Sequence, residues 1–248
     1  MAAMIGPGAP ASPSGTTFSG ALLSDDAWLA RRIADTRRRW GCRDDRTAGT
    51  LWWYSAAAVL TDAGPRMLLA HGVAPDPALD RLECTLTEQG YLGAVRAEGV
   101  VREPGEYGTA LASALSAVIV PLSAVSGASE RALWAVASDA LAGRALAAGP
   151  AAGRLAEACA LARRLTVPPL VPARFVDVVP HPDTPPTGRI QRLPADPSSP
   201  VPATGRRIVR RCSCCLIFQA PGQAKCVSCP RRRPADRDAA LAVWFQSS

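Results

Sequence analysis

The chain has 248 residues, of which 48% are apolar, 5% aromatic and 20% charged, with 28 Lys and Arg against 21 Asp and Glu. This length suffices for one domain with a small appendage, and an alanine-rich, aromatic-poor composition favours helix over sheet, so we expect a mainly helical protein. A membrane protein is not expected, because the longest apolar stretch, residues 110–125, contains Ser113, Ser116 and Pro121 and is shorter than the roughly 20 residues of a span.

Residues 1–20 are rich in Gly, Pro and Ser and lack the charged start and apolar block of a secretory signal. We therefore expect a disordered tail in a cytoplasmic protein. A helical domain is predicted over residues 21–167, with Ser24 as the N-cap of its first helix. The expected helices cover residues 22–39, 44–64, 108–125, 129–148 and 152–165, with Pro65 ending or interrupting the second.

Residues 81–87 alternate apolar and polar side chains, and residues 91–96 do so more weakly, with Gly90 between them. This pattern predicts a β-hairpin. If the domain has a substrate cleft, we expect this hairpin and the helix carrying Trp52 and Tyr54 to line it.

Residues 168–208 are predicted to be a proline-rich connection. Eleven prolines lie between residues 168 and 202, and proline donates no hydrogen bond to a helix or a sheet. The segment is therefore expected to be extended and irregular. It leads to a small C-terminal cysteine-rich module, residues 209–248, which a short helix over residues 236–245 would close.

Five of the eight cysteines lie between Cys212 and Cys229, and in a reducing compartment such clustering indicates metal binding. Cys226 and Cys229 form a C-x-x-C pair that follows the adjacent pair Cys214 and Cys215 after ten residues, with a Pro-Gly turn between. Adjacent thiolates suit a cluster of several irons, whereas the C-x-C of Cys212 and Cys214 offers an alternative for zinc. On spacing alone, zinc and a cluster fit equally well, and disulfide or redox chemistry stays open.

The string RRCSCCLIFQAPGQAKCVSCP resembles the C-terminal signature of the FhuF-like ferric-siderophore reductases. Looser likeness extends to residues 47–60 and 132–138 and to the tract around residues 174–175. The resemblance implies a 2Fe–2S cluster and an enzyme that reduces siderophore-bound Fe³⁺ to Fe²⁺. Its cluster ligands would be Cys214, Cys215, Cys226 and Cys229. Cys212 departs from the pattern as an extra thiol.

Siderophores hold Fe³⁺ more tightly than Fe²⁺, so a one-electron carrier suits iron release in the cytosol. The basic residues that flank the cysteines are Arg206, Arg207, Arg210, Arg211, Lys225, Arg231, Arg232, Arg233 and Arg237. These residues either form a solvated surface or create a positive electrostatic field that attracts anionic groups. We expect Arg210 and Arg211 to raise the reduction potential of the cluster. The expected partners are a ferric siderophore and a separate electron donor such as a ferredoxin, because no nucleotide-binding fingerprint is present. Peripheral contact with an inner-membrane siderophore importer is compatible with this setting.

Two other functions are consistent with the motif. One is a zinc ribbon that binds nucleic acid or protein, although few aromatics lie among the arginines, so no nucleic-acid partner is expected. The other is a cluster protein that senses iron or redox state. The isolated His71 and His181 are assigned no site role, and the remaining cysteines are expected to be core thiols, namely Cys42, Cys84 and Cys159.

Overall fold

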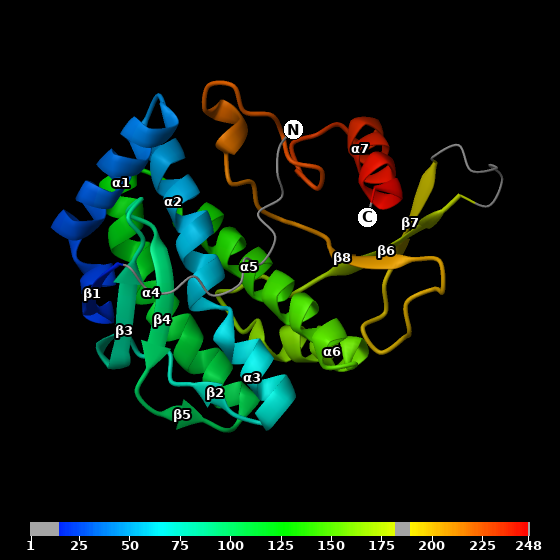
Figure 1. Cartoon of the computed structure of the whole chain (residues 1–248), viewed down its shortest axis with the longest axis horizontal. Coiled ribbons are helices and arrows are strands. Elements are labelled where there is room, and N and C mark those ends of the chain that lie inside the picture. The colour runs from blue at the N-terminus through cyan, green and yellow to red at the C-terminus, as the bar shows by residue number, and fades with distance from the viewer. Residues whose placement is uncertain (1–14, 182–188, 248) are drawn as a thin grey trace.

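The computed structural model describes residues 15–181 and 189–247, and helices dominate the first part of the chain (Figure 1). The α-helices are α1 (Asp26–Trp40), α2 (Asp45–Leu60), α3 (Ala63–His71), α4 (Pro104–Ser126), α5 (Glu130–Ala151), α6 (Leu155–Leu165) and α7 (Pro234–Gln246). The prediction of a mainly helical protein is confirmed. The helix expected over residues 44–64 ends at Leu60, and Pro65 lies in the first turn of α3, where its missing N–H is tolerated.

Aspartate side chains fix where the first two helices begin. The Asp25 carboxylate accepts a hydrogen bond from the Trp28 amide at 2.6 Å, so Asp25, and not Ser24, is the N-cap of α1. Asp44 accepts one from the Thr47 amide at 2.7 Å and caps α2. Each carboxylate satisfies a free amide and complements the positive end of the helix dipole.

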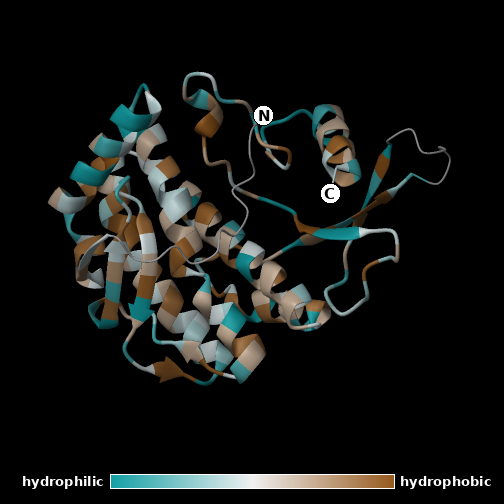
Figure 2. Ribbon diagram, in the orientation of Figure 1, coloured by the Kyte–Doolittle hydropathy of each residue, from teal (hydrophilic) through white to brown (hydrophobic). Residues whose placement is uncertain are grey.

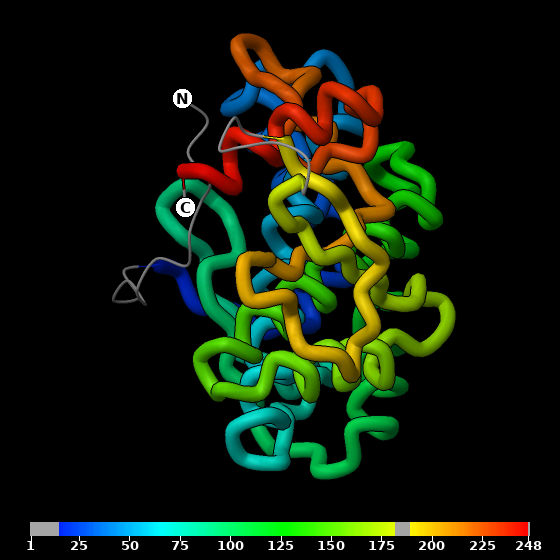
Figure 3. The backbone as a smooth tube through the Cα atoms, turned by 90° about the vertical axis from the view of Figure 1, so that its right-hand side faces the viewer, coloured from blue at the N-terminus to red at the C-terminus, as the bar shows by residue number. Residues whose placement is uncertain are grey.

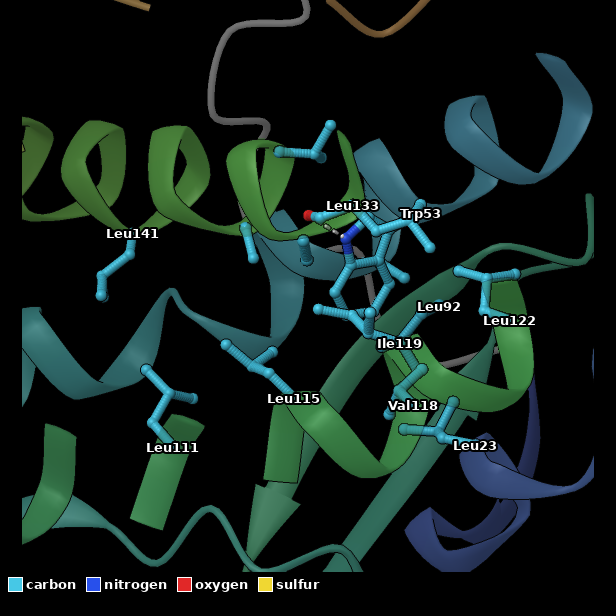
Figure 4. Close-up of a cluster of buried hydrophobic side chains, with 14 of the residues drawn as sticks. Leu23, Trp53, Leu92, Leu111, Leu115, Val118, Ile119, Leu122, Leu133 and Leu141 are labelled. Carbon is cyan, nitrogen blue, oxygen red and sulfur yellow. Dashed lines mark hydrogen bonds between the residues drawn. The ribbon is translucent and has the colours of Figure 1, made fainter. Parts of the chain in front are cut away.

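The main core lies between α1, α2, α4 and α5. Figure 4 shows the Trp53 ring of α2 among apolar side chains that include Leu115 and Ile119 of α4. Trp53 is fully buried, and its Nε1 donates a hydrogen bond to the Leu133 carbonyl at 2.8 Å. The indole is therefore packed without an unsatisfied donor. Hydrophilic residues of α1 lie on the outside of the domain (Figure 2).

Helix α4 is the one helix in the described part of the chain whose length and hydropathy would suit a membrane span. It runs through the domain and contacts α1, α2, α5 and α6. Its buried side chains include Leu111, Leu115 and Leu122. Core packing therefore accounts for its apolar composition.

The predicted hairpin is confirmed as β3 (Leu82–Leu86) and β4 (Leu92–Ala97), and Gly90 takes a positive φ at its turn. A third strand, β1 (Thr16–Ser19), pairs with β3. The disordered tail predicted over residues 1–20 is therefore wrong for residues 16–20. Thr and Phe favour the extended conformation, and the strand they form pairs with the free edge of β3. Residues 1–14 lie outside the described residues. A short pair joins β2 (Ala74–Pro75) to β5 (Val100–Val101).

The proline-rich connection contains regular structure, which corrects the expectation of an irregular segment. Its antiparallel sheet has the order β7-β6-β8, formed by β6 (Phe175–Pro180), β7 (Ile190–Pro194) and β8 (Arg206–Val209). Pro180 and Pro194 occupy strand ends, where proline is tolerated, and the central strand is rich in valine and phenylalanine. Residues 182–188 lie outside the described residues.

The C-terminal part packs along one side of the helical domain. Strand β8 contacts α5, α7 contacts β7, and the 3-10 turn η3 (Ile217–Gln219) contacts α2. Seen from that side in Figure 3, the yellow-to-red segments lie in front of the helices. The chain between β8 and α7, which carries the cysteine motif, thus runs beside α2 and α5 (Figure 1).

Candidate metal centre

The loop between the two cysteine pairs folds back, as the Pro-Gly spacing predicts. Gly222 takes a positive φ of 72° at the turn. Leu216, directly after the adjacent cysteines, also takes a positive φ, of 62°, a conformation that costs an L-residue about 1–2 kcal/mol. Leu216 is buried, and the loop is tied to α2 by a hydrogen bond from the Thr47 hydroxyl to Gln219 Oε1 at 2.8 Å. The burial of Leu216 and the hydrogen bond to Gln219 together hold the loop in its folded-back conformation.

The fold brings sulfurs from the two pairs together. Sγ of Cys214 lies 3.7 Å from Sγ of Cys229. Two thiolates on one tetrahedral ion, each about 2.3 Å from it, would lie about 3.8 Å apart. The first cysteine of the adjacent pair is thus spaced to share an ion with the last cysteine of the C-x-x-C pair.

The other two predicted ligands lie nearby. Burial raises the pKa of the Cys226 thiol, the Arg211 guanidinium lowers it, and the Cys229 and Cys215 thiols raise it further. Cys215 and Cys229 are buried, with 6% and 2% of their surface exposed. The four predicted ligands therefore lie in one region, in which Cys215 and Cys229 are buried and Cys214 and Cys226 are partly exposed. Within the described residues, no group of three or more His, Cys, Asp or Glu side chains is arranged to hold a single metal ion.

Asp139 of α5 anchors the segment that precedes the ligands. Its Oδ2 accepts hydrogen bonds from the Ser213 amide at 2.8 Å and the Ser213 hydroxyl at 2.6 Å, and its Oδ1 accepts one from the Cys212 amide at 3.0 Å. The carboxylate is 8% exposed. Asp139 is not among the site residues expected from the sequence, where the available signal was an aspartate within an alanine-rich helix, in which it is a weak helix former.

The extra thiol, Cys212, points at α5. Its Sγ lies 3.3 Å from Asp139 Oδ1 and 3.7 Å from the Ala135 carbonyl oxygen. Burial, followed by the charge of Asp139, raises the pKa of the Cys212 thiol to about 11. Cys212 is therefore a protonated thiol that donates to α5.

Arg211 places a buried cation beside the cysteines. Its Nη1 lies 3.6 Å from Cys226 Sγ, its Nε lies 3.5 Å from Asp139 Oδ2, and its guanidinium lies over the Tyr54 ring at 5.3 Å. Burial alone would lower the pKa of Arg211, but Tyr54, Asp139 and the nearby thiols raise it overall. Nη2 is buried and has no hydrogen-bond partner among the described residues. Arg211 therefore places a positive charge beside the Cys226 sulfur and keeps one further N–H donor without a partner among the described residues.

Several other basic residues in this region have structural partners. Arg207 forms a buried two-point ion pair with Asp177 at 2.8 and 2.9 Å. Arg206 lies over the Trp244 ring at 5.6 Å, and Arg232 donates to the Cys226 carbonyl at 2.8 Å. Arg210, in contrast, is exposed. Part of the basic run therefore stabilises the fold through contacts with other residues.

A cleft of about 1050 Å³ opens between the helical domain and the C-terminal part. One wall comes from α2, α3, α5 and residues 93–95 of β4, and the other from β8, α7 and the residues between Cys226 and Cys229. Tyr54 and residues 93–95 of the hairpin line it, two of the elements that the sequence had suggested for a cleft wall. Trp52 is instead buried in the core.

The remaining sequence predictions concern residues outside this region. The three other cysteines are buried, as expected for core thiols: Cys42, Cys84 and Cys159. His71 lies at the C-terminal end of α3, away from the cysteine motif.

Residues 211–231 match the FhuF 2Fe-2S C-terminal domain. No match was found among curated proteins or among solved structures. The match agrees with the resemblance seen in the motif and supports the expected 2Fe–2S cofactor. Two observations fit such a cluster: the Cys214–Cys229 sulfur spacing and the unpartnered, buried donor of Arg211 among the described residues.

Proposed function

We propose that this chain, whose residues 211–231 match the FhuF 2Fe-2S C-terminal domain, is a ferric-siderophore reductase. The ligands of its cluster are Cys214, Cys215, Cys226 and Cys229. One observation carries the proposal: the cleft is lined by Val227 and Ser228, which lie between two of these ligands. A chelate in the cleft would therefore sit against the ligand loop.

The cluster supplies a one-electron carrier when bound. The chain's own residues give it a defined setting. Asp139 fixes the segment before the ligands to α5, and Arg211 sets a positive charge and an N–H donor beside Cys226. Positive charge and N–H donors near thiolate sulfur stabilise the more negative, reduced state, so Arg211 raises the reduction potential.

The reaction requires no bond to the protein. Siderophore-bound Fe³⁺ gains one electron, the reduced protein loses one, and an external donor restores it. Val227 and Ser228 line the cleft and lie between Cys226 and the buried Cys229, so a cluster held by these ligands would lie beside the cleft wall.

A separate protein, such as a ferredoxin, is the proposed electron donor. The exposed Arg210, Arg231 and Arg233 near the motif would attract an acidic protein surface. A cytoplasmic setting, with peripheral contact to an inner-membrane siderophore importer, belongs to the same proposal.

The test begins with anaerobic purification, metal analysis and electron paramagnetic resonance of the reduced protein. We expect a brown protein with about two irons per chain. The reduced protein is then mixed with ferric siderophores while its visible absorbance is followed, and reoxidation coupled to Fe²⁺ release is expected. A colourless protein with one zinc would support the zinc-ribbon alternative. An intact cluster that ferric chelates fail to reoxidise would support a sensor.

A further inference from the structure

The cleft has an excess of positive charge. Among the described residues that line it, the charged side chains are Arg66, Arg144, Arg211, Asp62 and Asp139. Asp139 is already occupied by the amides of residues 212 and 213. The cations therefore outnumber the carboxylates, and one of the two carboxylates, that of Asp139, already accepts hydrogen bonds from the backbone.

The two arginines from the helical domain share the other carboxylate. Arg144 Nη1 lies 3.3 Å from Asp62 Oδ1, and Arg66 Nε lies 3.8 Å from Asp62 Oδ2. Arg144 also donates through Nε to the Ala58 carbonyl at 3.1 Å. The Arg66 side chain is 62% exposed and that of Arg144 is 33% exposed, so both retain accessible N–H donors at the cleft.

Aromatic rings and open volume complete the cleft. Tyr54 is 41% exposed although it follows two buried tryptophans, and Trp244 lies on the opposite wall. A Cβ atom added at Gly143 would meet no atom of the described residues within 4 Å. A volume of about 1050 Å³ is at the upper end of small-molecule sites, which suits a bulky chelate.

We propose that this cleft binds the ferric siderophore as an anionic chelate, with Arg66 and Arg144 binding its negatively charged oxygens. Tyr54 and Trp244 flank the chelate, and its iron faces Val227 and Ser228. This inference rests on the proposed reductase function and adds the binding site and the charge of the substrate. Neutral chelates lack the charge that the arginines recognise and bind more weakly.

Binding is measured on the cluster-loaded protein with gallium(III) complexes, because Ga³⁺ resembles Fe³⁺ and is not reduced here. The probes are a triply negative tris-catecholate complex and a neutral tris-hydroxamate complex, followed by calorimetry. We expect the anionic complex to bind more tightly. In the double variant Arg66→Gln with Arg144→Gln, its affinity should fall roughly tenfold or more, while Arg31→Gln on the exposed surface of α1 has no effect.

Two further variants separate binding from folding. Asp62→Asn releases both arginines and should tighten binding of the anionic complex several-fold, an effect that structural damage would not produce. Gly143→Leu places an apolar side chain in the cleft without breaking α5, since leucine is a better helix former than glycine. It should weaken binding of both complexes while iron content and spectrum stay those of the parent.

The proposal is overturned if the neutral complex binds as tightly as the anionic one, or if Gly143→Leu and the double arginine variant bind like the parent. Its failure is distinguishable from failure of the reductase proposal. Rapid reoxidation by ferric chelates that Gly143→Leu leaves unchanged would keep the reductase and reject this site. Gallium binding with the expected pattern, without reoxidation by ferric chelates, would keep the site and reject the reductase.

Discussion

The hydroxyl of Ser213 donates a hydrogen bond to the buried carboxylate of Asp139 at 2.6 Å, across 74 residues of sequence. The cysteine motif is thereby attached to α5, a helix that also lines the cleft and contributes to the main core. Because the same carboxylate accepts from two backbone amides, the position of the first ligand depends on the helical domain.

Asp139→Asn should loosen this attachment. The NH2 group of asparagine replaces one accepting carboxylate oxygen and cannot accept hydrogen bonds, so at least one buried N–H of residues 212–213 loses its partner, at a cost of about 1–3 kcal/mol. We expect a lower urea midpoint and faster bleaching of the visible absorbance in the presence of an iron chelator. Ser213→Ala removes only the hydroxyl and keeps the hydrogen bonds from the two backbone amides. It is the milder control, with an expected loss of about 1 kcal/mol in the free energy of unfolding. Equal bleaching rates in parent and Asp139→Asn would contradict the anchoring role.

Serine substitutions should distinguish the four proposed ligands from the extra thiol. Replacing any one of Cys214, Cys215, Cys226 and Cys229 is expected to lower iron content or change the paramagnetic spectrum. Cys212→Ser is the matched control within the same segment and should retain both, because its sulfur points at Asp139. Loss of iron in the Cys212 variant would show that the ligand set is wrong.

Arg211→Gln should lower the midpoint potential of the cluster. Loss of the positive charge 3.6 Å from Cys226 Sγ destabilises the more negative reduced state, with an expected shift on the order of 50 mV. The exposed neighbour, Arg210→Gln, is the control and should move the potential much less. Spectroelectrochemical titration measures both, and equal shifts in the two variants would reject a specific effect of Arg211.

The N-cap of α2 predicts a pH-dependent stability. Hydrogen bonds from Thr47 hold the pKa of Asp44 below its usual 3.8. The stabilisation by the charged cap is therefore present above that value and is lost as the pH falls through the lower folded-state pKa. Asp44→Ala should cost about 1 kcal/mol at pH 7.

Asp44→Asn keeps a capping oxygen without a titratable group. Its stability should therefore fall less than that of the parent below pH 4, as read from urea unfolding at several pH values. If the free energy of unfolding of this variant depends on pH in the same way as that of the parent, the Asp44 cap is not the group responsible.

Much of the fold follows from local sequence rules. The helices were predictable because apolar residues recur at helical spacing and aspartates occupy the starts of α1 and α2, and the hairpin because alternation flanks a glycine. The sheet β7-β6-β8 was not predictable from proline content, because proline excludes only particular ladder positions and Pro180 and Pro194 lie at strand ends. Strand β1 depends on a partner more than 60 residues away in sequence, at the edge of β3.

The cysteine motif by itself indicated a metal or cluster site, and its family likeness supplied the candidate ligand set and the cofactor. Only the tertiary structure decided that Cys214 lies against Cys229, that Cys212 points at α5, and that a cleft with arginines from α3 and α5 borders the ligand loop. The reason is physical: spacing limits which thiols can reach a common ion, whereas the partners of each side chain are set by packing between segments far apart in the chain.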